Sequence, residues 1–574
     1  MNHPFGEDES RKKRPSRLVY FGAWYRSSNP TTCPQVTMPS LRRHFAWVLL
    51  LGIVATGLAG CDGPRPATPA NSQKKDSQPP FAISEEIEFA DEVAKIDSPN
   101  AEWGAIVYQG EKIGFVLSNY ENIQGDDGPA VRTTMVERMA LRRAGQVLNI
   151  RIENVFLETP NGHLKEFSTK IEEGTAVKRF TGKVSEDGKT LNILSESTAG
   201  IARSTDKVQW QPEFGGLYAT YGLTRNPPLK AGEKRETTAL VPSLNQPGMM
   251  RAEAMEEELV KMLDGSSVRL LKGRSITQIR GQPVLESTIW LDDDGDIVKS
   301  TSPIQQIEIY RCTKEFALSK NKPVSFDLVT DTMVPVKGMP RVNVSQLPEL
   351  TYRLQLKGSN PADVFPSRTN QTLTSVDDHT ADLQVWQVRP GTTLPESLQN
   401  GDNPTPEDLA SSPLIEVNSP AVQELVKQVT LPPEGDWQKA LALEKFVHQT
   451  IQQKDFSQGF LSAAAVAKQK VGDCTEHSVL LIALLRANKI PARGAVGLVY
   501  VDLGTKQGFA YHMWTEAWIK DRWVPLDATR GTGGIGVDYI KVTQSSLNGS
   551  SAFASFLPVT QVIGQLNVDV LEAN

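Results

Sequence analysis

The spacing of apolar residues changes once along this chain of 574 residues, near Ser419. Before that point, from about residue 85 to residue 347, short segments of strand composition alternate with turn signals, for example at 104–108 and 146–152. After it, apolar residues recur at helical spacing in 421–429 and 437–451. A run of strands followed by a helical region predicts an α+β protein, and a chain of this length has room for about two to four domains.

The region 85–347 has the pattern of a mostly antiparallel β domain. Asp-Gly or Asn-Gly pairs separate its strand-like segments, and such pairs favour the tight turns of β-hairpins. They stand at 127–128, 161–162, 187–188, 264–265 and 294–295. Two stretches, 154–165 and 287–298, both read as strand, polar turn and strand, which indicates a duplicated sheet. Residues 250–263 have helical composition between strand-like neighbours, so either a helix or a strand is possible there.

Two further regions follow this β domain. Residues 348–418 hold another strand-like piece at 351–356 and proline-rich spacers, and we expect them to form a β-containing connecting region. Residues 419–574 combine the helical segments with strands expected at 494–501, 511–519 and 523–526. We expect this last region to be a mixed α+β domain.

The N-terminal residues resemble a targeting segment. Arg42 and Arg43 precede an apolar stretch at 45–58 that has the length of a signal-peptide core. The stretch ends in Leu58-Ala59-Gly60-Cys61, which resembles the bacterial lipobox. In that class of proteins the signal peptide is cleaved before the cysteine, and the cysteine carries the lipid. A plain transmembrane anchor is the alternative, although the apolar stretch is short for a bilayer.

The lipobox resemblance implies a membrane-anchored protein outside the cytoplasm. Met38 begins a segment of ordinary signal-peptide proportions and is the expected start, so 1–60 would comprise an N-terminal extension and the signal peptide. Residues 61–84 are proline-rich and lack the large apolar residues of a core, so we expect a tether attached to lipid at Cys61. The choice between inner and outer bacterial membrane stays open.

Charge and cysteine content narrow the functions. A net charge of -6 gives no reason to expect a nucleic-acid partner. Of the four cysteines, only Cys312 and Cys474 lie in the body of the chain, which excludes a disulfide framework and a zinc site of several thiolates. The acidic run at 292–296 resembles a calcium loop, but its glycine is misplaced and no glutamate closes it, so we expect a hairpin turn. No metal or cofactor is expected.

Cys474 stands where a helix should begin. Asp473 is a favourable N-cap residue, and Glu476 follows three positions later, as a capping box requires. Cys474 would then occupy the first helical position, where the helix dipole stabilises a thiolate. The helix should run to about Asn488 and be buried, because apolar residues nearly encircle it. The alternative is that Cys474 is an ordinary small core residue.

A predicted hairpin brings a histidine and an aspartate together. Alternation along 511–519 places His512 and Trp514 on one face of a strand. A two-residue turn at Lys520-Asp521 would set Asp527 opposite Trp514 and diagonal to His512, at about 7–8 Å. Asp527 could then orient the imidazole while His512 takes the proton of the Cys474 thiol, the arrangement of an activated cysteine nucleophile.

Two other histidines compete for a role. His477 shares a helix face with Cys474 and is an alternative base, but its position in the next turn suits packing or a supporting hydrogen bond better. His448 lies on an amphipathic helix, where we expect a structural role.

These motifs together resemble the core of the transglutaminase-like superfamily. The matching segments are Gly472-Asp473-Cys474-Thr475-Glu476-His477, Tyr511-His512-Met513-Trp514 and Trp523-Val524-Pro525-Leu526-Asp527. The resemblance extends over 420–545 and implies a papain-like fold, in which a helix carrying the cysteine packs on an antiparallel sheet. It also implies Cys474 as nucleophile, His512 as base and Asp527 as orienting residue. Met513 replaces the usual alanine, which should be tolerated because it points away from His512.

Members of this superfamily transfer acyl groups from amides in crosslinking, deamidation or peptide hydrolysis. From the capping box, the helix position and the strand alternation we expect Asp473, Glu476, His477 and Trp514 to support the site, and no oxyanion-hole side chain can be assigned. Three functions stay open: hydrolysis of peptide or isopeptide amides in a peptide or protein substrate, protein crosslinking with a lysine amine in place of water, and a non-catalytic binding or assembly module. The intact cysteine, histidine and aspartate favour an enzyme, and we favour hydrolysis because water is abundant outside the cytoplasm.

Overall fold

The computed structural model describes residue 96 and residues 98–571, except 126–127, 198–202, 280–281, 303–306, 321–324, 399–401, 434, 505 and 551. The expected signal peptide, the expected lipid attachment at Cys61 and the expected tether lie outside these residues. No helix within the described part of the chain is long and apolar enough to span a bilayer.

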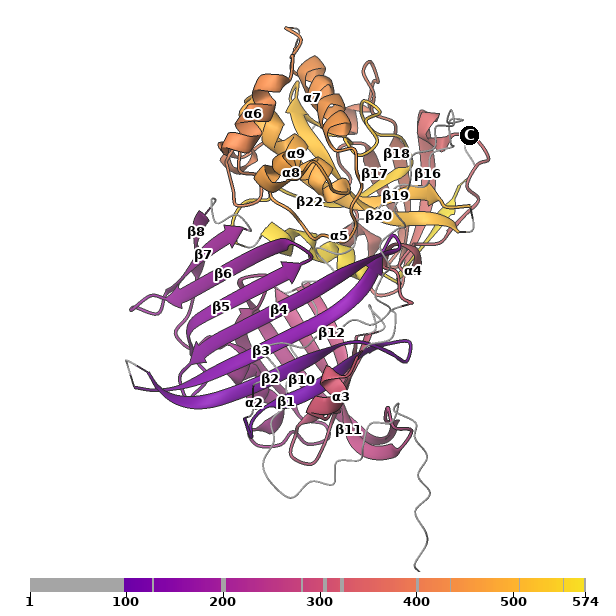
Figure 1. Cartoon of the computed structure of the whole chain (residues 1–574). Coiled ribbons are helices and arrows are strands. Elements are labelled where there is room, and N and C mark those ends of the chain that lie inside the picture. The colour runs from indigo at the N-terminus through magenta and orange to yellow at the C-terminus, as the bar shows by residue number, and fades with distance from the viewer. Residues whose placement is uncertain are drawn as a thin grey trace, which may run out of the picture.

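One continuous sheet of fourteen strands forms the N-terminal part of the molecule (Figure 1). Its strands are β1 (Glu102–Tyr108), β2 (Glu111–Gly125), β3 (Gly128–Arg143), β4 (Gln146–Glu158), β5 (Leu164–Glu173), β6 (Ala176–Val184), β7 (Thr190–Ser197), β8 (Arg203–Gln209), β9 (Lys234–Val241), β10 (Gln246–Lys261), β11 (Ser267–Ile279), β12 (Gln282–Leu291), β13 (Ile297–Ser302) and β14 (Ile307–Cys312). Within β1–β8 and within β9–β14 each strand pairs antiparallel with the next strand in the chain, and β1 pairs with β14, so that β8 and β9 are the two edge strands. The sheet therefore consists of two consecutive meanders joined edge to edge, as predicted for a mostly antiparallel region.

Strand β10 resolves the ambiguity at 250–263. Met250, Ala252 and Ala254 are buried, whereas Arg251 and Glu253 between them are not, which is the period of a strand. Pairing with β9 on one side and β11 on the other overrides the helical composition of the segment.

The predicted turns connect these strands. Gly162, Gly188, Gly265 and Gly295 have φ between +68° and +84°, a backbone region that glycine enters without steric cost. The acidic run at 292–296 is the hairpin turn between β12 and β13, closed by a hydrogen bond from Asp292 N to Asp296 O of 3.0 Å. Whether the two meanders arose by duplication stays a prediction.

A second sheet of five strands gathers distant parts of the chain. Its strands are β15 (Val336–Lys337), β16 (Glu349–Leu356), β17 (Gln371–Asp377), β18 (Thr380–Trp386) and β23 (Leu566–Val570), in the order β15-β23-β16-β18-β17. The region expected as a connector thus supplies three strands, and a strand from the C-terminal end of the chain lies between β15 and β16.

The C-terminal domain consists of a four-stranded antiparallel sheet with helices against it. The sheet order is β21 (Arg522–Leu526), β20 (Gln507–Ile519), β19 (Ala492–Asp502) and β22 (Tyr539–Ser545). The helices are α6 (Pro420–Gln428), α7 (Asp436–Thr450), α8 (Ala463–Gln469) and α9 (Cys474–Ala487), which gather in one region (Figure 1). Helix α9 packs against β19 and β20, as the predicted α+β fold requires.

Short helices complete the described chain. They are α2 (Leu217–Arg225), α3 (Lys314–Leu318), α4 (Leu328–Asp331) and α5 (Pro361–Val364), with 3-10 turns η2 (Val344–Gln346), η3 (Glu396–Leu398), η4 (Pro406–Asp408) and η5 (Ala552–Gln561).

The five-stranded sheet packs on the C-terminal domain. The Tyr352 hydroxyl donates a hydrogen bond to Val537 O at 3.0 Å, and the Tyr352 and Phe509 rings meet edge to face at 5.5 Å. Leu354 and Leu383 from this sheet share one buried apolar cluster with Leu498 of β19. The four-stranded sheet is therefore supported both by α9 and by the five-stranded sheet.

Candidate active site

Helix α9 begins at Cys474, and Asp473 is its N-cap residue. The Asp473 side chain accepts a hydrogen bond from Thr475 N at 2.8 Å, and Glu476 accepts one from Asp473 N at 3.0 Å. The predicted capping box is confirmed. Residues from Cys474 to Arg486 are all buried, so the helix is rigidly held, and its positive end lies at Cys474.

The β20–β21 hairpin brings His512 and Asp527 together. Lys520 and Asp521 form its two-residue turn with φ of 50° and 61°, and the pairing of Thr515 with Leu526 gives the predicted register. His512 Nε2 lies 2.8 Å from Asp527 Oδ2. Since Nε2 is engaged by the carboxylate, Nδ1 is the ring nitrogen that can accept a thiol proton.

Asp527 is held ionised in a fully buried position. Burial alone would raise the pKa of this carboxyl, but interactions with the His512 ring and the Tyr539 hydroxyl outweigh it and hold the pKa well below its usual range. The Tyr539 hydroxyl donates to Asp527 Oδ2 at 2.5 Å, and Thr529 N donates to Oδ1 at 2.8 Å. Both carboxylate oxygens are thus satisfied, which fixes the side chain relative to His512.

Glu444 of α7 holds the backbone of Asp527. Its Oε1 accepts hydrogen bonds from Asp527 N at 2.9 Å and from Gly534 N at 3.4 Å. Burial, together with the nearby charge of Asp527, raises the pKa of Glu444 to about 8. Sequence reasoning missed both Glu444 and Tyr539. They lie outside the quoted motifs, and only the tertiary fold brings them to Asp527.

Aromatic rings enclose His512. The Trp514 ring stacks near the imidazole, with ring centroids 6.3 Å apart and ring planes at 24°. The Tyr539 ring meets the imidazole edge to face, with ring centroids 5.8 Å apart and ring planes at 62°. Trp514 therefore lies beside His512, and its supporting role stays a prediction. Met513 packs instead in the apolar cluster around α9, on the other side of the strand.

The competing histidines have other contacts. His477 Nδ1 lies 2.6 Å from Asp473 O, and burial lowers the pKa of this ring. This contact is the supporting hydrogen bond expected for His477, and it ties the first turn of α9 to the cap. His448 Nδ1 lies 3.0 Å from Ala528 O, next to Asp527 in the chain.

The three central residues are closed to solvent in this conformation. Cys474, His512 and Asp527 each have an exposed fraction of 0%. A substrate must therefore be admitted by a movement of the surrounding chain. Neither Cys474 nor Cys312 forms a disulfide. In the described ranges no group of three metal-ligating side chains is placed to hold a metal ion.

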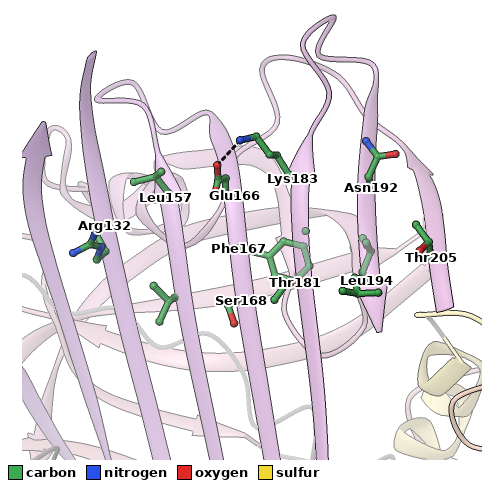
Figure 2. A pocket seen from close by; sticks show the side chains of 13 residues that line it. Arg132, Leu157, Glu166, Phe167, Ser168, Thr181, Lys183, Asn192, Leu194 and Thr205 are labelled. Atoms are coloured by element: carbon green, nitrogen blue, oxygen red, sulfur yellow. Dashed lines mark ion pairs between the residues drawn. The ribbon is translucent and has the colours of Figure 1, made fainter. Parts of the chain in front are cut away.

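A hollow of about 530 Å³ lies elsewhere, on the solvent-facing side of strands β3 to β8 (Figure 2). Arg132, Leu157 and Asn192 line it, and an exposed ion pair joins Glu166 to Lys183 at 2.8 Å. None of the sequence-predicted site residues lines this hollow, and it contains no cysteine or histidine.

Residues 423–528 match the sequence profile of the transglutaminase-like superfamily. Similar solved structures include a candidate cysteine protease from Cytophaga hutchinsonii, 16% identical, covering 39% of this chain and 86% of that chain with a TM-score of 0.25. A TGase is 15% identical over 28% of this chain and 43% of that chain, with a TM-score of 0.16. A β-barrel-like protein of a domain of unknown function from Brucella abortus is 10% identical over 37% of this chain and 94% of that chain, with a TM-score of 0.26.

No curated protein matches this sequence. These TM-scores are too low to support a family assignment. The assignment of residues 423–528 rests on the sequence profile. Residues 423–528, which contain Cys474, His512 and Asp527, are a transglutaminase-like superfamily domain.

Proposed function

We propose that this protein is a cysteine enzyme that hydrolyses peptide or isopeptide amide bonds through an acyl-thioester on Cys474. The observation that carries the proposal is the buried His512–Asp527 pair, on a hairpin of the same small domain whose capped helix begins at Cys474. A thiol at a helix N-terminus beside a histidine has a depressed pKa and is a nucleophile near neutral pH.

The proposed reaction consists of an acylation of Cys474 and a hydrolytic deacylation. His512 Nδ1 takes the thiol proton, and the Cys474 sulfur attacks the amide carbonyl carbon. The carbon–nitrogen bond then breaks, and His512 gives its proton to the leaving amine. Water adds to the thioester carbonyl carbon as His512 Nδ1 takes one of its protons. The carbon–sulfur bond then breaks to release the acid, and His512 returns the proton to the Cys474 sulfur, which regenerates the thiol. Asp527 stays ionised throughout and accepts a hydrogen bond from the Nε2–H group of His512, which keeps the orientation and tautomer of the imidazole ring.

Protein crosslinking is the second candidate. It shares the acyl-enzyme and differs only in the acceptor, a lysine amine in place of water. A non-catalytic module is the third, and the preserved network around Asp527 weighs against it, because a binding module has no need of an oriented imidazole.

The deciding experiment offers a labelled peptide amide with and without a primary amine, and identifies the product by mass spectrometry. We expect the free acid under both conditions with the wild type, no product with Cys474→Ala, and full activity with Cys312→Ala. An amine adduct as the main product would favour crosslinking. Wild-type protein that releases no product and whose Cys474 is alkylated only above about pH 8.5 would contradict the enzyme proposal.

The location of the enzyme is also a proposal. The lipobox-like Leu58-Ala59-Gly60-Cys61 supports a lipid anchor on Cys61, with the tether carrying the domains outside the cytoplasm. Metabolic labelling with a fatty-acid analogue should mark the wild type and leave Cys61→Ser unmarked. Equal labelling of the two would contradict the anchor.

A further inference from the structure

The tip of the β3–β4 hairpin from the large sheet is inserted against the C-terminal domain, at the end of the sheet nearest that domain (Figure 1). Arg143 ends β3 and Gln146 begins β4, with a two-residue turn between them. The hairpin contacts residues 455–460, which we term the 455–460 loop: Gln146 Oε1 accepts a hydrogen bond from Phe456 N at 2.9 Å. On the neighbouring strand β5, Glu173 O accepts one from Gly459 N at 3.0 Å.

This contact leaves no space for additional atoms. A Cβ atom on Gly459 would lie 2.4 Å from the Glu173 Cβ atom, and one on Gly174 would lie 2.3 Å from Ser457 O. The 455–460 loop is therefore clamped between the large sheet and the C-terminal domain.

Arg143 passes beyond this loop to the helix that carries the nucleophile. Its Nε donates to Phe456 O at 3.0 Å and its Nη2 to Gln458 O at 2.6 Å. The same Nη2 lies 2.5 Å from Asp473 Oδ2, and both side chains are buried, with exposed fractions of 0% and 1%. The N-cap carboxylate of α9 is thus paired with a cation from another domain, 330 residues away in the chain.

This pairing bears on the charge of the Cys474 sulfur. Asp473 precedes Cys474 directly, and an unpaired buried carboxylate beside the thiol would disfavour the thiolate by like-charge repulsion. The guanidinium of Arg143 cancels that charge, while the carboxylate still caps the helix through Thr475 N. Other titratable and charged groups of this neighbourhood are Glu476 and His477 on α9, His512 and Asp527 on the hairpin, Tyr539 of β22, Glu444 of α7, Lys454 and Asp455 at the start of the loop, and the buried Glu173–Lys178 pair beside it.

We infer that Arg143 is a positioning residue of the proposed enzyme, through which the large β-sheet domain neutralises the Asp473 cap and lowers the pKa of Cys474. The inference rests on the proposed function of Cys474. It gives the large sheet an indirect, electrostatic part in the chemistry, one that its own sequence does not show.

The experiment measures the rate at which iodoacetamide alkylates Cys474 in the full chain, from about pH 4 to about pH 10, by mass spectrometry of the Cys474 peptide. Because the site must open to admit the reagent, opening scales the rates at every pH and leaves the midpoint of the profile unchanged. A structural loosening therefore changes the plateau, whereas a change of charge moves the midpoint.

We expect Arg143→Met to raise the midpoint by about one pH unit or more, and Arg143→Lys to keep it near the wild type. Asp473→Asn retains a capping side chain but leaves Arg143 uncompensated, so it should lower the midpoint. The double variant should return toward the wild type. The matched control is Arg151→Met, which removes an arginine of β4 that is 28% exposed and pairs with Glu153 and Glu172, and it should leave the midpoint unchanged.

An unchanged midpoint in Arg143→Met, or a double variant as high as Arg143→Met, would overturn the inference. If Arg143→Met does not fold, Asp473→Asn decides alone, and a midpoint that is not lowered refutes the charge effect. A wild-type midpoint near 8.5 would instead contradict the proposed function, so the two failures are distinguishable.

Discussion

Glu444 should make the stability of the C-terminal domain fall as pH rises. This buried carboxyl of α7 has its pKa raised from 4.5 to about 8, chiefly by burial. In the unfolded chain it ionises near its ordinary pKa, whereas in the folded protein it stays protonated up to about pH 8. The folded state therefore binds more protons between these values, and stability is lost as pH rises through that window. Glu444→Gln keeps an acceptor for Asp527 N and removes the titration.

The size of the effect follows from the two pKa values. Each unit between them is worth about 1.4 kcal/mol, so the full cost above pH 8 is about 5 kcal/mol. For a domain of this size, 1 kcal/mol moves the melting temperature by about 2–4 °C. The melting temperature of Glu444→Gln relative to wild type should thus rise by roughly 3–6 °C for each pH unit between about 5 and 8.

Thermal unfolding followed by tryptophan fluorescence at several pH values measures this difference. Glu424→Gln is the matched control, because Glu424 lies on α6 with a side chain that is 62% exposed. Its difference from wild type should be flat across the same pH range. If the Glu444→Gln difference is equally flat, burial does not raise this pKa and the reasoning is refuted.

Three further substitutions test the network around the site and the sheet that carries it. Asp527→Asn should lower kcat by roughly 10³- to 10⁴-fold, because an amide cannot hold the same tautomer of His512; a loss below tenfold in steady-state assays would contradict the role. Tyr539→Phe removes a charge-assisted hydrogen bond worth about 1.5–3 kcal/mol, so kcat should fall roughly 10- to 100-fold, and unchanged kinetics would exclude a role in orienting Asp527. Lys541→Met leaves the buried Glu516, its partner at 2.6 Å, with one cation fewer; denaturant unfolding should show a loss of about 3–5 kcal/mol, and a loss under 1 kcal/mol would show that Arg493 alone suffices.

Local chemistry made much of the C-terminal domain predictable. A capping box depends on residues three positions apart, and a two-residue hairpin transmits register directly from Lys520-Asp521 to Asp527. The helix start at Cys474 and the His512–Asp527 contact could therefore be derived without knowledge of the rest of the fold.

Contacts between distant segments could not be predicted from the sequence, because they depend on the tertiary fold and not on neighbouring residues. Tyr539 and Glu444 approach Asp527 from other elements, and nothing in their neighbouring residues marks them. Arg143 could not be recognised because it ends a strand of the large sheet, and an arginine at the end of a strand is usually exposed to solvent. The segment at 250–263 stayed undecided for a different reason, since its residues favour a helix and only the pairing on both edges of β10 makes it a strand.

The strand β23 has a consequence for how this protein can be divided. It follows the transglutaminase-like domain in the chain but is hydrogen-bonded to β16, which precedes that domain, and to β15 earlier still. Topologically the domain is an insertion into the five-stranded sheet, between strands β18 and β23. A fragment cut at residue 419 would carry β23 without its partners and expose the side of the four-stranded sheet that Tyr352 and Leu354 cover. The smallest piece that keeps this architecture intact begins before β15.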